Sequence, residues 1–422
     1  MPTRRSFLRT GSVAGVATLS GLAGCVGRLA DSPLGRFALD GTTTGPGAAD
    51  RAPADAEAFT TFRGDLRRQG YQPETTVPST VEVAWELDAV NTGEHTAAKA
   101  SAVRDPAGNY VIPGDDGAVR SVALDGSVDW LAETSPSRRG IHGTPTIANG
   151  LVYVGAYDGA LYAFDVESGE QLWRTQLGDA IGSSPGYHDG LVYIAVEHSA
   201  PDGSLAACDA LTGEVVWTDG RPTDHPHSTI AIDRELGKLT VGSNDGTLYG
   251  WSYPDREPLW TFDTGRPIKG PIATYDGAAF FGSWDESVYR VDLETGKEDW
   301  AVATDDLVMG GASVDTDSET VYIGGHDGFL RAFDAASGEE EWHFRTGGYI
   351  VGCPTVTRDH VLVGSYDTNL YALDKADGAA VWSVDVAGWV SCDPLVDDGV
   401  VFTSRATDET PGKAVRLVGT GE

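Results

Sequence analysis

The chain has 422 residues, and its 63 Asp and Glu against 30 Lys and Arg give a formal net charge of −33. A surface this acidic repels phosphate groups, so the composition excludes nucleic acid as a partner. The hydrophobic content of 41% and the 11 Trp are too high for a disordered chain, and they predict a folded domain with a large core.

The N-terminal segment has the pattern of an export signal. Arg4 and Arg5 precede Ser-Phe-Leu and a weakly apolar run of 15 residues, which ends in Leu-Ala-Gly-Cys at Cys25. The run is too short to cross a bilayer core of about 30 Å. It resembles a twin-arginine signal followed by a lipobox, which implies that residues 1–24 are removed and that Cys25 is lipidated. A plain N-terminal anchor helix is the alternative.

Residues 25–58 are rich in Gly, Pro, Ala and Asp and show no helical or strand period. We interpret them as a flexible tether that holds a folded domain of residues 59–422 outside the cell membrane. The many carboxylates and only six Lys resemble proteins of extreme halophiles, so we expect a halophilic archaeon as the source.

A tryptophan recurs every 40 to 45 residues through the rest of the chain. Each copy reads as four short strands of about 4–7 residues, separated by turn dipeptides such as Asn149-Gly150 and Asp158-Gly159. A period in the forties with all-strand units predicts a β-propeller. The recurring residues are Trp85, Trp130, Trp173, Trp217, Trp260, Trp300, Trp342 and Trp382.

The two ends of the repeat region complement each other. Residues 81–90 form a Trp strand with no strands ahead of it, whereas the chain after Trp382 offers three strands without a Trp strand. Three strands and one strand make a blade, so we predict an eight-bladed ring that the N-terminal strand closes. A seven-bladed ring with two unpaired ends is the alternative.

The repeats carry a further spacing, in which Ala163, Gly169 and Trp173 recur at equivalent positions of other blades. This spacing resembles the tryptophan-docking motif of the quinoprotein-like propellers, the family of pyrroloquinoline quinone (PQQ)-like repeats. Residues 59–73 resemble the lead-in segment of the same family. The resemblance implies that the Trp side chains pack between blades and are structural. Arg256 replaces the Gly in the fourth blade and Arg290 replaces the Ala in the fifth, so these two blades depart from the docking motif.

Strand order places the second-to-third turns and the links between blades at one end of the ring, which we call the top face. Its loops are varied and rich in aromatic residues, whereas the opposite turns are stock turn sequences, so we expect a binding site at the top face. Candidate binding residues are His142, Tyr157, Asn244, Lys269, Trp284, His326, Tyr366 and Trp389.

The family resemblance also implies what a catalytic member would need: PQQ on a Trp floor beneath a disulfide of adjacent Cys, with Ca²⁺ and an Asp base. The chain has no adjacent Cys pair. We therefore expect no catalytic residues and no cofactor, and PQQ with Ca²⁺ is the alternative. We predict no metal site, because the top-face His come from different blades.

Cys353 and Cys392 occupy similar places in the first strands of two neighbouring blades. In an exported protein they could form a disulfide or stay as two buried thiols.

These observations favour a lipid-anchored, monomeric propeller on the extracellular face that binds a protein partner as a non-enzymatic scaffold. A PQQ-dependent dehydrogenase of alcohols or sugars is the second hypothesis, and a binder of a small ligand such as a sugar is the third.

Overall fold

The computed structural model describes residues 43–45, 57–92, 95–408 and 410–420, which all belong to one compact unit. The predicted export signal with Arg4 and Arg5, the lipidation site Cys25 and most of the tether lie outside these residues. Every regular element within the described ranges is a strand, and no helix there could span a membrane.

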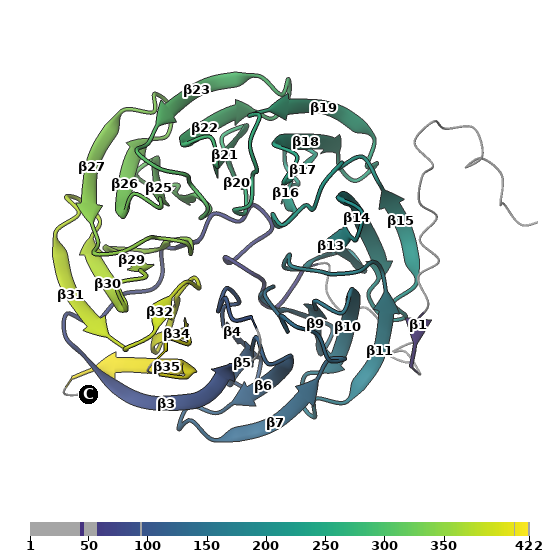
Figure 1. Cartoon of the computed structure of the whole chain (residues 1–422), viewed down its shortest axis with the longest axis horizontal. Coiled ribbons are helices and arrows are strands. Elements are labelled where there is room, and N and C mark those ends of the chain that lie inside the picture. The colour runs from purple at the N-terminus through teal and green to yellow at the C-terminus, as the bar shows by residue number, and fades with distance from the viewer. Residues whose placement is uncertain (1–42, 46–56, 93–94, 409, 421–422) are drawn as a thin grey trace, which may run out of the picture. The chain divides into compact units, whose positions relative to one another are not determined.

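Eight antiparallel sheets stand around a common axis, so the predicted eight-bladed β-propeller is confirmed (Figure 1). Each blade runs outward from the axis in chain order, as the repeat of four strands requires.

The first four blades are β4 (Val103–Arg104), β5 (Tyr110–Pro113), β6 (Ala118–Val122) and β7 (Val128–Glu133); β8 (Thr146–Ala148), β9 (Leu151–Gly155), β10 (Ala160–Asp165) and β11 (Gln171–Gln176); β12 (Gly186–His188), β13 (Leu191–His198), β14 (Asp202–Asp209) and β15 (Val215–Asp219); and β16 (Ala231–Asp233), β17 (Lys238–Gly242), β18 (Thr247–Ser252) and β19 (Pro258–Asp263).

The remaining blades are β20 (Ala273–Tyr275), β21 (Ala278–Ser283), β22 (Ser287–Asp292) and β23 (Glu298–Ala303); β24 (Ser313–Asp315), β25 (Thr320–Gly324), β26 (Phe329–Asp334) and β27 (Glu340–Arg345); β28 (Thr355–Thr357), β29 (His360–Gly364), β30 (Asn369–Asp374) and β31 (Ala380–Asp385); and β33 (Leu395–Asp397), β34 (Gly399–Arg405), β35 (Gly412–Gly419) and β3 (Val81–Asn91), with β32 (Trp389–Val390) paired to β34.

The ring closes as the sequence predicts. Strand β3 pairs antiparallel with β35, from Val81 opposite Gly419 to Asn91 opposite Gly412. In Figure 1 the purple N-terminal strand lies beside the yellow C-terminal strand at the rim. This pairing joins residues more than 300 positions apart and gives the eighth blade its outermost strand, which closes the ring.

The lead-in segment has a role that the repeat pattern does not reveal. Residues 57–75 pass along the innermost strands of successive blades, and backbone hydrogen bonds link them to Ile147, Ile232, Thr274, Val314 and Val356. Within this segment β2 (Tyr71–Gln72) adds a parallel strand to β28, while β1 (Thr43–Thr44) pairs with β11 at the outside. The segment thus ties six blades together from within.

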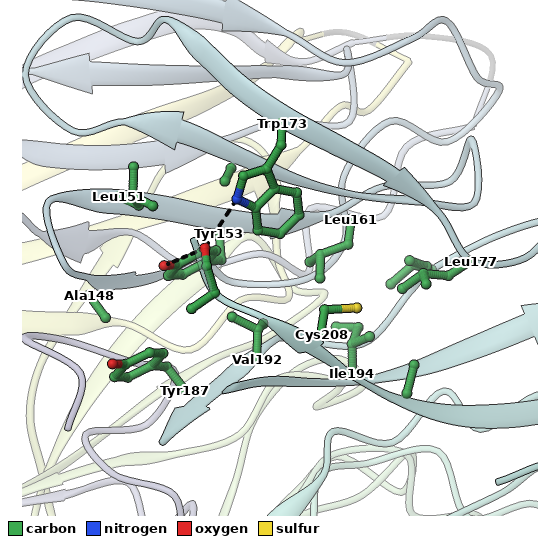
Figure 2. Close-up of a cluster of buried hydrophobic side chains, with 14 of the residues drawn as sticks. Ala148, Leu151, Tyr153, Leu161, Trp173, Leu177, Tyr187, Val192, Ile194 and Cys208 are labelled. Atoms are coloured by element: carbon green, nitrogen blue, oxygen red, sulfur yellow. Dashed lines mark hydrogen bonds between the residues drawn. The ribbon is translucent and has the colours of Figure 1, made fainter. Parts of the chain in front are cut away.

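The docking tryptophans are structural, as the family resemblance implies. Trp173 is fully buried, its Nε1 donates to the carbonyl of Ala210 in the next blade at 3.1 Å, and Tyr153 donates to the same oxygen. Figure 2 shows Trp173 and Tyr153 in the apolar layer between the second and third blades, which also contains Cys208. A Cβ on Gly213 of the next blade would approach the Trp173 ring to 2.7 Å.

The two irregular blades depart from this pattern in different ways. Trp300 pairs across its own blade with Arg290, and both side chains donate to the carbonyl of Ala335 in the next blade, so docking survives the Ala replacement. Trp217 faces the fourth blade, where Arg256 lies over its ring at 5.9 Å. Among the eight docking tryptophans, all of them described, Trp217 alone makes no hydrogen bond from its indole nitrogen.

Candidate functional site

A cavity of about 580 Å³, part of it open to solvent, lies on the propeller axis at the top face. The links between blades converge there, because each first strand starts beside the axis. Phe62 of the lead-in segment lines the cavity from below, and the neighbouring Arg63 side chain is 1% exposed. Arg63 donates to Asp393 at 3.1 Å and to the carbonyl of Ala312 at 2.6 Å. The lead-in segment therefore closes the lower end of the axis.

Three of the predicted binding residues line this cavity. His142 and Tyr157 come from the second blade and its link, and their rings meet edge to face with centroids 4.4 Å apart. Lys269 enters from the link before the fifth blade, with Nζ 4.2 Å from the centre of the Trp284 ring. The face of the Trp284 ring thus attracts the Lys269 ammonium and holds it at the edge of the cavity.

The other predicted residues stand around the rim and do not line the cavity. Tyr366 stacks on Trp389 with centroids 5.1 Å apart, and His326 stacks on Tyr349 at 4.8 Å. Asn244 is bound through its backbone to the link of the preceding blade. The top face therefore carries an aromatic rim around a polar centre.

The centre of the cavity is positively charged, in contrast to the rest of this acidic protein. Lys99 and Lys269, two of the six Lys of the chain, both line it. Burial and the charge of Lys269 lower the pKa of Lys99 to about 8, which keeps it mostly protonated at neutral pH. Arg139 lies over the Tyr157 ring at 5.3 Å and adds a third positive charge. A site with this charge attracts an anion.

The buried carboxylate of Asp115 lies next to the His142 ring. Asp115 accepts a hydrogen bond from the Ala98 amide at 2.8 Å through Oδ2, while its Oδ1 lies 3.3 Å from Nε2 of His142. Burial raises the pKa of Asp115 to about 6, and burial together with Lys99 holds the pKa of His142 well below its usual value. At neutral pH this pair is a carboxylate next to a neutral imidazole, which can accept a proton.

A second group of titratable residues adjoins the same cavity. Glu197 lies on β13 with Nδ1 of His227 3.0 Å from its Oε1 and Nδ1 of His225 3.5 Å from its Oε2. Burial alone would raise the pKa of Glu197, but His227, His225 and Arg139 hold it below its usual value. The carboxylate is therefore ionised at neutral pH.

The sequence left a disulfide and two buried thiols open for Cys353 and Cys392, and the structure has the two buried thiols. Each sulfur turns towards a different backbone: Cys353 accepts from the Gly311 amide at 3.2 Å, and Cys392 accepts from the Thr403 amide at 3.1 Å. Burial raises their pKa values to about 12 and about 11, so both stay protonated.

A larger hollow of about 940 Å³ lies where the lead-in segment meets the third and fourth blades, away from the top face. Its charged side chains are paired with one another, as in Arg67 with Asp233 at 3.4 Å and Arg234 with Glu57 at 2.5 Å. Such pairs neutralise each other on the surface, so we place the candidate functional site in the axial cavity.

Four residues of the axial site were not predicted from the sequence: Lys99, Asp115, Arg139 and Glu197. Alignment on Trp fixes the outer strands of the blades, whereas these residues lie on the first blade, on its flanking links and at the end of β13. The scarcity of Lys in the chain was a usable signal, because each of the six Lys stands out against the acidic composition.

Comparison with known proteins relates the chain to dehydrogenases. It is 30% identical over 157 residues to the 1-butanol dehydrogenase (cytochrome c) of Thauera butanivorans, an alignment that covers 34% of this chain and 20% of that protein. The quinohemoprotein alcohol dehydrogenase of Comamonas testosteroni has the same fold, with a TM-score of 0.73 at 16% identity over 89% of this chain and 82% of that chain. In sequence, the chain therefore spans about a fifth of the dehydrogenase it matches.

An assembly factor is also related. The outer membrane protein assembly factor BamB of Shewanella oneidensis is 27% identical over 266 residues, which cover 59% of this chain and 64% of that protein. A family model described as outer membrane protein assembly factor BamB matches residues 115–236, 234–348 and 326–412. These matches cover most of the repeat region. The chain therefore belongs to the PQQ-like repeat family that this model, outer membrane protein assembly factor BamB, describes.

Proposed function

We propose that this protein is a PQQ-dependent oxidoreductase that oxidises an alcohol or a sugar hydroxyl in the axial cavity. This proposal replaces the non-enzymatic scaffold predicted from the sequence, which the dehydrogenase relatives contradict. Export, the lipid anchor at Cys25 and the monomeric state stay predictions.

The observation that carries the proposal is the cationic centre of the cavity. PQQ is a planar anion that bears several carboxylates. Lys99, Lys269 and Arg139 supply positive charge where a ligand on the axis would lie. A cation cluster in a chain of net charge −33 favours binding of an anionic ligand at this place.

The residues present therefore fit PQQ in charge. Lys99 and Lys269 would hold its carboxylates, and the Trp284 ring fixes the Lys269 ammonium from the side. When bound, the quinone supplies an acceptor for the two electrons that leave the substrate carbon. Phe62, which also lines the cavity, would place an apolar ring against the bound quinone.

The chain itself can remove the hydroxyl proton of the substrate. Neutral His142 at the cavity wall accepts the proton, and the Asp115 carboxylate 3.3 Å behind it stabilises the imidazolium that forms. Calcium prefers six to eight oxygen ligands. The one group of metal-binding side chains found among the described residues surrounds a carboxylate with two imidazoles. We therefore assign no step to calcium.

The test is dye-linked oxidation of primary alcohols and aldoses by the full chain after addition of PQQ, in high salt. We expect turnover that His142→Gln lowers by about 100-fold or more, the usual contribution of a general base. His343→Gln is the matched control, because His343 is half-exposed on a β-strand far along the chain and lines no cavity. Absence of turnover with every alcohol and aldose in the presence of bound PQQ would refute the proposal.

A further inference from the structure

We propose that Glu197, His225 and His227 form a binding site for a divalent transition metal of the zinc class at the wall of the axial cavity. The site does not depend on PQQ, and it is the one group of three metal-binding side chains found among the described residues. The three ligand atoms lie within 4.8 Å of one another. From the sequence we predicted no metal site, because we considered only the top-face His of different blades and did not single out Glu197.

The distances suit a common ion. Zinc lies about 2.0–2.2 Å from imidazole nitrogen and carboxylate oxygen. Two ligands at such distances and at tetrahedral or octahedral angles are about 3.0–3.4 Å apart, which follows from the same bond lengths. The observed separations are 3.0 Å from Oε1 of Glu197 to Nδ1 of His227 and 3.5 Å from Oε2 of Glu197 to Nδ1 of His225, so each imidazole faces its own carboxylate oxygen. Because the three ligand atoms spread over up to 4.8 Å, the cluster would have to contract around a bound ion.

The hydrogen bonds around the cluster leave the ligand atoms available. Nε2 of His225 lies 2.8 Å from the carbonyl of His198, to which it donates, so in the neutral ring Nδ1 carries the lone pair that faces Glu197. A backbone carbonyl on the second ring nitrogen is the usual support of a metal-binding His. The Glu197 side chain is 4% exposed, and its Oε1 has no hydrogen-bond partner although His227 lies beside it.

An unpartnered, ionised oxygen at this depth costs free energy unless a cation occupies the space before it. Nδ1 of His227, 3.0 Å from this oxygen, is the nearest of the imidazole ligand atoms. Lys99 and Lys269 supply positive charge near Glu197 but donate no hydrogen bond to its Oε1. A metal ion would neutralise the carboxylate directly. The nearby ammonium groups repel a metal ion, so the affinity of the site is lower than that of the same three ligands without neighbouring charges.

Space for a further ligand exists beside the cluster. Gly182 lines the cavity, and a Cβ at its position would lie 2.8 Å from Oε1 of Glu197, 3.0 Å from Nδ1 of His227 and 2.7 Å from the Tyr157 hydroxyl. Three protein ligands with an open fourth position are typical of metal sites that bind water or substrate. Two imidazoles and one carboxylate favour zinc, iron or cobalt over the oxygen-seeking calcium and magnesium.

The test is titration of the full chain, purified without a histidine tag and freed of metal by a chelator, with Zn²⁺ and separately with Ca²⁺, in the absence of PQQ. We expect one equivalent of Zn²⁺ to bind and Ca²⁺ to bind far more weakly. The spectrum of added Co²⁺ should show a tetrahedral or five-coordinate nitrogen and oxygen environment. Because no quinone is present, the outcome is independent of the proposed enzyme activity.

Variants locate the ion. Glu197→Gln and His227→Gln should each weaken Zn²⁺ binding by at least about tenfold. His326→Gln should not, because His326 lies on the rim among aromatic rings. If Glu197→Gln does not fold, His225→Asn provides the same test at a ring that is 32% exposed. Zn²⁺ binding that survives all three ligand substitutions, equal affinity for Ca²⁺, or no binding by the native chain would overturn the proposal.

Discussion

The docking of Trp173 against Gly213 of the next blade predicts a large cost for Gly213→Ala. Gly213 has φ +74°, and an added Cβ would lie 2.6 Å from Oγ1 of Thr175 and 2.7 Å from the Trp173 ring. The left-handed backbone costs a residue other than Gly about 1–2 kcal/mol, and the overpacking adds about 1–3 kcal/mol. We therefore expect the free energy of unfolding to fall by about 2–5 kcal/mol.

Gly190→Ala separates the two contributions. Gly190 belongs to the same blade and has φ +79°, but an added Cβ would meet no atom within 4 Å. Its substitution should cost only the backbone part, about 1–2 kcal/mol. Both variants can be compared with the native chain by equilibrium unfolding in denaturant, followed by Trp fluorescence. Equal losses in the two variants would refute the argument that the Trp173 ring, rather than the turn itself, requires Gly at position 213.

Three further predictions concern the core, the axis and the pH profile. Trp173→Phe should destabilise the protein by about 1 kcal/mol more than Trp217→Phe, because only Trp173 loses an interblade hydrogen bond; comparable unfolding midpoints would contradict this. Arg63→Met should cost about 3–5 kcal/mol because it strands the buried Asp393 carboxylate, whereas Arg358→Met, at a half-exposed surface pair, should leave the denaturation curve unchanged. Alcohol oxidation should decline as the pH falls through about 6, where Asp115 gains a proton and no longer stabilises a protonated His142; a rate that stays flat from pH 7 to 5 would exclude Asp115 from this role.

The propeller architecture could be predicted from the sequence because a docking Trp recurs in every blade. Their spacing indicated the number of blades, and the unmatched strand at residues 81–90 indicated the closure that β3 and β35 make. Local propensity and turn residues suffice for such a prediction, since each blade is a local unit. The path of residues 57–75 along six blades could not be predicted in this way, because it consists of backbone contacts with partners far along the chain.

The candidate site was predicted in part for the same reason. Strand order placed His142, Tyr157 and Lys269 at the correct end of the ring, and the structure brings them to one cavity. Strand order could not distinguish residues that line the cavity from residues on its rim. Tyr366 and Trp389 differ from Tyr157 only in how their loops fold around the axis. Asp115 and Glu197 were hidden among the 63 acidic residues, and only their burial distinguishes them.

The most direct test of the central claim, that the axial cavity binds an anionic quinone, is an equilibrium titration of the full chain with PQQ by absorption. The native chain should bind one equivalent, and the double variant Lys99→Gln, Lys269→Gln should lose most of this affinity. Lys413→Gln is the matched control, because Lys413 pairs with Glu86 at 2.8 Å on the outer strand of the eighth blade. Binding that the double variant keeps, or no binding by the native chain, would contradict the claim.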